Sequence, residues 1–150
     1  MAAVLVPLVA RAQDAPAPAG QEAAAPAAAA EKPASAGLHL ELNRLEQNGE
    51  ACRATFVAKN GYGSELEETA FELALFDKAG LVSLMTVFDF GALPAGKTLV
   101  KRFDMKGIAC GDVSRVLVNA ATRCRGAGID TAECAKSFVT ANRTDIEFGR

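Results

Sequence analysis

The residues best suited to chemistry are four cysteines that lie far apart along the chain: Cys52, Cys110, Cys124 and Cys134. Thiolates bind zinc, exchange disulfides or act as nucleophiles, and each use has its own spacing. A zinc site usually has cysteine pairs a few residues apart or histidines close by, and a redox pair has Cys-x-x-Cys beside a helix. The sequence has neither spacing. The cysteines therefore indicate structural disulfides, and we expect no metal and no cofactor.

The other candidates for catalysis are the single histidine, His39, and an acidic run. His39 alternates with leucines, so we expect it on the solvated face of a strand and not as a general base. Paired carboxylates in the acidic run could support glycoside hydrolysis, although a charged turn is the more ordinary use of such a run. We therefore expect a non-enzymatic protein, and an enzyme that uses the acidic run ranks last. The run consists of Glu65, Glu67, Glu68 and Glu72.

The start of the chain indicates the compartment. Residues 1–10 (MAAVLVPLVA) are apolar, and Ala10-Arg11-Ala12 has the small-x-small pattern of a signal-peptidase site. We predict that residues 1–12 are a signal peptide, truncated at its N-terminus because no basic residue precedes the apolar run. The general-secretion and twin-arginine routes stay open, and an apolar N-terminus on a cytosolic protein is the alternative. The apolar stretch is about half as long as a membrane-spanning helix, so we expect a periplasmic protein whose mature chain does not insert into a membrane.

Composition then divides the chain in two. Residues 13–37 are rich in Ala, Pro, Gly and Ser and contain no β-branched or aromatic side chain, which predicts a disordered linker. Residues 38–150 form one predicted domain. The whole chain has 16 Lys and Arg against 18 Asp and Glu, a net charge of -2. No basic stripe interleaved with aromatic residues occurs, so we expect no binding to nucleic acid.

Apolar residues in the domain mostly alternate with polar ones, which is typical of half-buried strands. Turn residues such as Asn48-Gly49 separate the alternating segments. The pattern predicts an all-β, seven-stranded antiparallel sandwich, immunoglobulin/fibronectin-like, with a small up-and-down barrel as the alternative. Residues 64–69 and 129–136 are the expected helical segments, the second with Asp130 or Thr131 as N-cap. The predicted strands are 38–43, 52–59, 70–75, 82–90, 98–105, 113–120 and 137–148.

Three segments resemble a group of short exported alphaproteobacterial proteins of unknown function, described as signal-sequence domain proteins. The segments are 40–56 (LELNRLEQNGEACRATF), 93–98 (LPAGKT) and 109–119 (ACGDVSRVLVN). The pattern is also similar to small immunoglobulin/fibronectin-like modules of bacterial envelope proteins. Both resemblances imply an exported β-domain of the bacterial envelope, and neither implies a catalytic residue.

The four cysteines allow three disulfide pairings. Cys52 lies at the start of the second predicted strand and Cys110 just before the sixth, and in a sandwich these strands belong to opposite sheets. Cys124 and Cys134 lie within the predicted loop 121–136. We therefore favour Cys52–Cys110, which crosses the core, and Cys124–Cys134, which staples the loop.

These features predict a binding or adaptor domain with a protein partner in the periplasm. The alternative is a periplasmic hydrolase inhibitor that presents the stapled loop 121–136. Arg123 and Arg125 in this loop are the candidate partner-binding residues, because guanidinium groups could anchor an acidic patch. The competing surface is the first predicted strand, which we expect at a free edge of its sheet.

Overall fold

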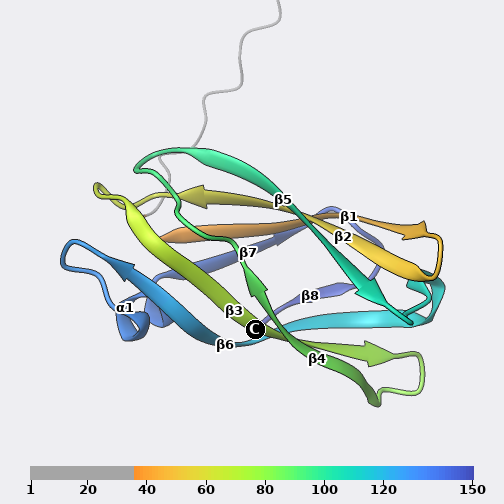
Figure 1. Ribbon diagram of the computed structural model, residues 1–150. Helices are drawn as coiled ribbons and strands as arrows, with labels where there is room; N and C mark the ends of the chain where they lie inside the picture. Colours follow the sequence, from red (N-terminus) through yellow and green to blue (C-terminus); the bar gives the residue numbers. More distant parts are fainter. Residues whose placement is uncertain (1–35) are drawn as a thin grey trace, which may run out of the picture. The chain divides into compact units, whose positions relative to one another are not determined.

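The structure is a computed structural model that describes residues 36–150, so the predicted signal peptide (1–12) and residues 13–35 of the predicted linker lie outside the described residues. Eight strands form two four-stranded sheets, which confirms an all-β sandwich (Figure 1). The strands are β1 (Leu38–Asn48), β2 (Ala51–Asn60), β3 (Leu66–Asp77), β4 (Val82–Asp89), β5 (Thr98–Lys106), β6 (Val113–Gly126), β7 (Phe138–Asn142) and β8 (Glu147–Gly149). A 3-10 helix, η1 (Cys110–Asp112), precedes β6, and helix α1 (Thr131–Lys136) follows it.

The strand order is β5-β2-β1-β7 in one sheet and β4-β3-β6-β8 in the other. The strands form two open sheets, whereas a barrel would need one closed sheet. The pairs β1–β2, β2–β5, β3–β4 and β3–β6 are antiparallel as predicted, but β1 with β7 and β6 with β8 are parallel pairs. The sheets are therefore mixed, with eight strands instead of seven antiparallel ones.

The extra strand arises because the predicted strand 137–148 breaks in the middle. The side-chain oxygen of Asn142 accepts hydrogen bonds from the backbone N–H and the hydroxyl of Thr144, at 2.9 and 2.8 Å. An Asn side chain that bonds two residues ahead makes a turn. The turn sends Phe138 into one sheet with β7 and Phe148 into the other with β8.

The core lies between the two sheets and is rich in phenylalanine. Phe56 of β2 is fully buried, and four rings surround it at centroid distances of 5.7 to 6.1 Å. Such edge-on contacts between rings are each favourable by about 0.5–1.5 kcal/mol beyond their burial. The alternation of residues 52–59 thus puts every second side chain of β2 into the core, as predicted. The four rings are those of Phe88, Phe90, Phe103 and Phe148.

The two predicted helices have different outcomes. Residues 129–136 contain α1, and the Asp130 carboxylate accepts a hydrogen bond from the backbone N–H of Glu133 at 2.8 Å, which confirms Asp130 as N-cap. Residues 64–69 are not helical, because Leu66 is fully buried and begins β3. The backbone of Leu66 exchanges two hydrogen bonds with Leu93, at 2.8 and 3.0 Å. Burial and pairing override the weak local preference for helix.

Candidate protein-binding surfaces

Both predicted disulfides are present. Cys52 of β2 is bonded to Cys110 of η1, so the bridge links one sheet to the segment that leads into β6 of the other. Cys124 of β6 is bonded to Cys134 of α1. Two disulfides are typical of a protein in an oxidising, extracytoplasmic environment. Within residues 36–150, every cysteine is bonded, and no His, Cys, Asp or Glu side chains group as metal ligands do.

The described part of the chain contains no helix that is long and apolar enough to cross a membrane.

Arg123 and Arg125, the predicted partner-binding residues, lie on β6 and not on a loop. The prediction was wrong on this point because β6 continues to Gly126, where residues 121–126 pair with the first half of β3. The Arg123 guanidinium is 2.7 Å from the Asp89 carboxylate of β4, and that of Arg125 is 2.9 Å from the Glu68 carboxylate of β3. An acidic partner would have to displace these carboxylates.

The predicted loop 121–136 is therefore mostly regular structure. It contains the end of β6, a turn and α1, and the backbone of Ile129 closes the turn by hydrogen bonds with Gly126 at 3.0 and 3.1 Å. The Cys124–Cys134 bridge fastens α1 to β6 and does not staple an extended loop.

The candidate catalytic residues of the acidic run form ion pairs and a hydrogen bond with neighbouring strands. Glu67 and Glu68 both form ion pairs with Arg125, at 3.7 and 2.9 Å, across the pairing of β3 with β6. The carboxylate of Glu72 accepts a hydrogen bond from the side-chain amide of Asn119. These acids therefore line the outer face of a sheet. His39 is half-buried on β1, between the buried Leu38 and Leu40.

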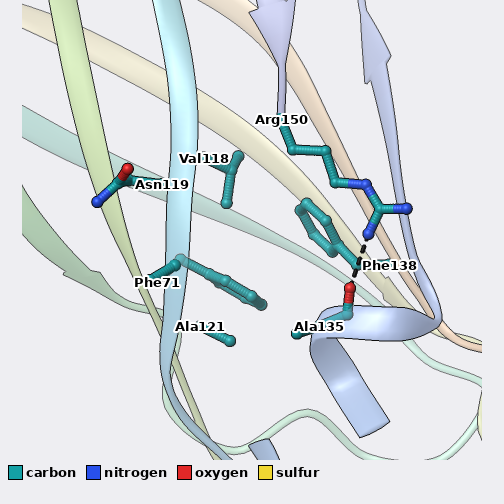
Figure 2. A pocket seen from close by; sticks show the side chains of 8 residues that line it. Phe71, Val118, Asn119, Ala121, Ala135, Phe138 and Arg150 are labelled. Carbon is teal, nitrogen blue, oxygen red and sulfur yellow. Dashed lines mark hydrogen bonds between the residues drawn. The ribbon is translucent and has the colours of Figure 1, made fainter. Parts of the chain in front are cut away.

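A small hollow lies between the β3–β6 pair and the segment of α1 and β7 (Figure 2). Its volume is about 120 Å³, well below the roughly 300 Å³ at which pockets for drug-sized ligands begin. The stacked rings of Phe71 and Phe138 form one wall, with centroids 5.0 Å apart. Arg150 donates a hydrogen bond to the carbonyl oxygen of Ala135 at 2.7 Å and closes one side of the hollow. The hollow is thus a packing defect between elements.

The first strand is not the free edge that the sequence predicts. β1 lies between β2 and β7, and residues from Leu38 to Leu42 pair on both sides. The parallel partner β7 follows β1 by about a hundred residues in the sequence, so local alternation could not reveal it. A partner strand therefore cannot add to β1 between Leu38 and Leu42.

Strand β4 lies at the edge of its sheet and pairs with β3 alone (Figure 1). The backbone N–H of Phe90 donates to the carbonyl of Thr69 at 2.8 Å, in the same antiparallel register as β4 and β3. Hydrogen-bonded pairs alternate along such a ladder. From Leu84 to Asp89, the even-numbered residues of β4 thus turn their N–H and C=O groups toward β3, and the odd-numbered residues turn theirs toward the open edge. Ser83 is an extra residue in a β-bulge, where the register shifts opposite Leu75 and Phe76. We call Met85, Val87 and Asp89 the β4 edge.

The β4 edge also exposes apolar side chains. Met85 is 54% exposed and Val87 is 45% exposed. Their even-numbered neighbours, such as Phe88, point into the core. On the outer face, Met85 pairs with the buried Ala74 of β3, which pairs in turn with Leu117 of β6. An apolar strip therefore runs across three strands and ends at an open backbone edge.

Strand β5 forms a different kind of edge on the opposite sheet. Strand β5 begins and ends beside charged residues, and its solvent-facing side has Arg102, Asp104 and Lys106. Lys101 is half-buried and lies on the same side of β5 as the core residues Phe103 and Met105. Charged side chains, above all inward-pointing ones, protect an edge from pairing with another chain. Strand β4 has a single charged residue, Asp89, at its end.

Comparisons of the chain with protein-family models, with curated proteins and with solved structures found no match. We therefore infer the function from the geometry of the chain itself.

Proposed function

We propose that the chain is a non-enzymatic, exported binding domain that acts in the periplasm as an accessory or adaptor protein of the bacterial envelope. It binds a protein partner by adding the partner's strand to the β4 edge. The observation that carries this proposal is the exposure of Met85 and Val87 on an edge strand that lacks protective charges. Exposed apolar patches and open edges are common binding sites.

Strand addition would use the backbone and the side chains together. The N–H and C=O groups of Met85 and Val87 would bond to the partner's backbone, as in other cases of β-augmentation. Covering the exposed halves of the Met85 and Val87 side chains would contribute roughly 2 kcal/mol, about half of the value for full burial of both. Backbone pairing would provide most of the affinity, and the apolar strip would select partners with apolar side chains at alternate positions.

We further propose that the sandwich is immunoglobulin/fibronectin-like. In that architecture, strands A, B and E lie in one sheet, C′, C and F lie in the other, and a disulfide links B to F. If β1, β2 and β5 correspond to A, B and E, and β4, β3 and β6 to C′, C and F, the observed neighbours agree. The Cys52–Cys110 bridge then matches the B–F disulfide. Strands β7 and β8 depart from the pattern, since both pair in parallel.

The resemblance to short exported alphaproteobacterial proteins and the periplasmic location belong to the same proposal, and the two disulfides support an oxidising compartment. The hydrolase inhibitor stays a second proposal with a narrower basis. An inhibitor inserts an exposed loop, and in the segment 121–136 the turn between Gly126 and Asp130 is the part between regular elements.

The test is capture of partners from periplasm by tagged protein, followed by identification of what is bound, including untagged copies of the chain itself. The double variant Met85→Lys with Val87→Lys should lose the partner, because two lysines would face the incoming strand. Val100→Lys is the matched control, since Val100 is 59% exposed on β5. Loss of the partner on charge reversal at Arg123 and Arg125, with capture by the double variant intact, would contradict the proposal.

A further inference from the structure

We infer that the strand received by the β4 edge is β4 of a second copy of this chain, so that two sheets join antiparallel about a twofold axis. This inference rests on the proposed function, because it names the partner of the same edge. Its basis is the self-complementary sequence of β4, VSLMTVFD.

The open backbone groups determine the register. Leu81 is already used in the hairpin turn, where its carbonyl accepts from Asp77 N–H at 2.9 Å. Ser83 lies in the bulge, so Leu84 to Phe88 form the regular open segment, and a twofold axis at its centre passes beside Thr86. Odd-numbered residues then face odd-numbered residues across the axis, as their outward N–H and C=O groups require.

In this register each cross-strand pair is compatible. Met85 faces Val87 of the other copy on the outer face, and Leu84 faces Phe88 of the other copy on the inner face. The two Thr86 residues face each other at the axis. Apolar pairs and Thr–Thr pairs stabilise adjacent antiparallel strands by about 0.2–1 kcal/mol each. The apolar strip of each copy would continue into that of the other.

The charges also fit this arrangement. Asp89 is the one charged residue of β4 and lies at its end. In the antiparallel pair it lies beside the start of β4 of the other copy, which has no charged residue. The two Asp89 side chains lie at opposite ends of the pair, roughly 20 Å apart for six residues of strand. At physiological salt this distance exceeds twice the screening length of about 8 Å, so their repulsion is small.

The contact is short, and this determines its strength. One pair of edge strands buries less surface than the roughly 1,000 Å² expected of a lasting interface. We therefore expect a reversible equilibrium between monomer and dimer. Dimer formation would also cover Met85 and Val87, which removes the aggregation risk of an open apolar edge.

The test uses sedimentation equilibrium of the protein purified from periplasm, over a wide range of concentrations. The average mass of the unaltered chain should rise toward twice that of one copy. Met85→Lys with Val87→Lys should be monomeric throughout, as should Met85→Glu with Val87→Glu. A mixture of these two variants should recover the dimer, because opposite charges then face each other. Circular dichroism and intact disulfides verify folding, and the Val100→Lys control should dimerise like the unaltered chain.

Three results would overturn the inference, and they separate it from the proposed function. If the unaltered chain is monomeric at all concentrations but the β4 variants lose a different captured protein, the function stands and the self-association is wrong. If the chain is monomeric and the variants still capture that protein, both are wrong. If both charge variants dimerise as well as the unaltered chain, the dimer forms through another surface.

Discussion

Gly37 packs directly against the backbone of Ser137, so that a Cβ atom added to Gly37 would overlap the Ser137 carbonyl oxygen. Gly37 has a φ of 137°, a conformation that side chains strongly disfavour. Its carbonyl accepts a hydrogen bond from Gly61 N–H at 2.8 Å. This contact holds the start of β1 beside the start of β7. Gly37 therefore belongs to the folded domain, although the sequence placed it at the end of the linker.

Gly37→Ala should lower the free energy of unfolding by more than about 1 kcal/mol, because both the φ angle and the Ser137 contact oppose a methyl group. Gly63→Ala is the matched control, since a Cβ there would meet open space and the φ of Gly63 is not positive. Urea denaturation of both variants measures the difference. Equal stability of the two variants would show that the chain before Leu38 is not held by this contact.

The two disulfides should contribute unequally to stability. Cys52–Cys110 joins residues 58 apart in sequence, and Cys124–Cys134 joins residues 10 apart. On the loop-entropy model the first stabilises by about 4 kcal/mol and the second by about 2.7 kcal/mol. The double alanine variant of the first pair should therefore unfold at lower urea concentration than that of the second. The reverse order would mean that anchoring α1 matters more than linking the sheets.

Tyr62 should ionise at unusually high pH. Burial raises the pKa of its phenol from 10.0 and the Glu133 carboxylate acts in the same direction, whereas the nearby Ser137 side chain acts against them. The folded state holds the phenol proton more tightly than the unfolded state does. The resulting contribution to stability is complete below pH 10 and is lost as pH rises through the folded-state pKa. Tyr62 is the single tyrosine and the sequence has no tryptophan, so tyrosinate absorbance reports it alone.

In the unaltered protein the absorbance should titrate above pH 10, and the urea midpoint should fall over the same range. Tyr62→Phe should remove this part of the pH dependence. A phenol that titrates normally in the folded protein would contradict the assigned burial.

Local patterns in the sequence predict the features that depend on neighbouring residues. Alternation predicts β2 with Phe56 in the core, Asp130 is predicted as a helix cap, and the placement of Cys52 on one strand and Cys110 just before a strand of the other sheet predicts their pairing. In each case a short segment contains the determining signal: a period of two, a capping side chain, or a cysteine next to a strand.

Features that depend on strand order could not be predicted in this way. Residues 121–126 have no regular alternation and become strand because they pair with β3. The sequence pattern places Asn142 within a strand. In the structure, its side chain makes the turn that separates β7 from β8. Met85 and Val87 are apolar on the face opposite the core residues of β4, which is a usable signal. Whether that face belongs to a central or an edge strand is decided by the topology.

The most direct test of the β4 edge is backbone amide hydrogen exchange, resolved by residue. It is recorded on dilute monomer and again with the strand partner bound, whether a second copy or another protein. We predict slow exchange at Leu84, Thr86 and Phe88 in both states, because their N–H groups bond to β3.

At Met85 and Val87 we predict fast exchange in the monomer and at least about tenfold slower exchange when the partner is bound. Protection of these two amides in the dilute monomer, or fast exchange at both with the partner bound, would contradict strand addition at β4.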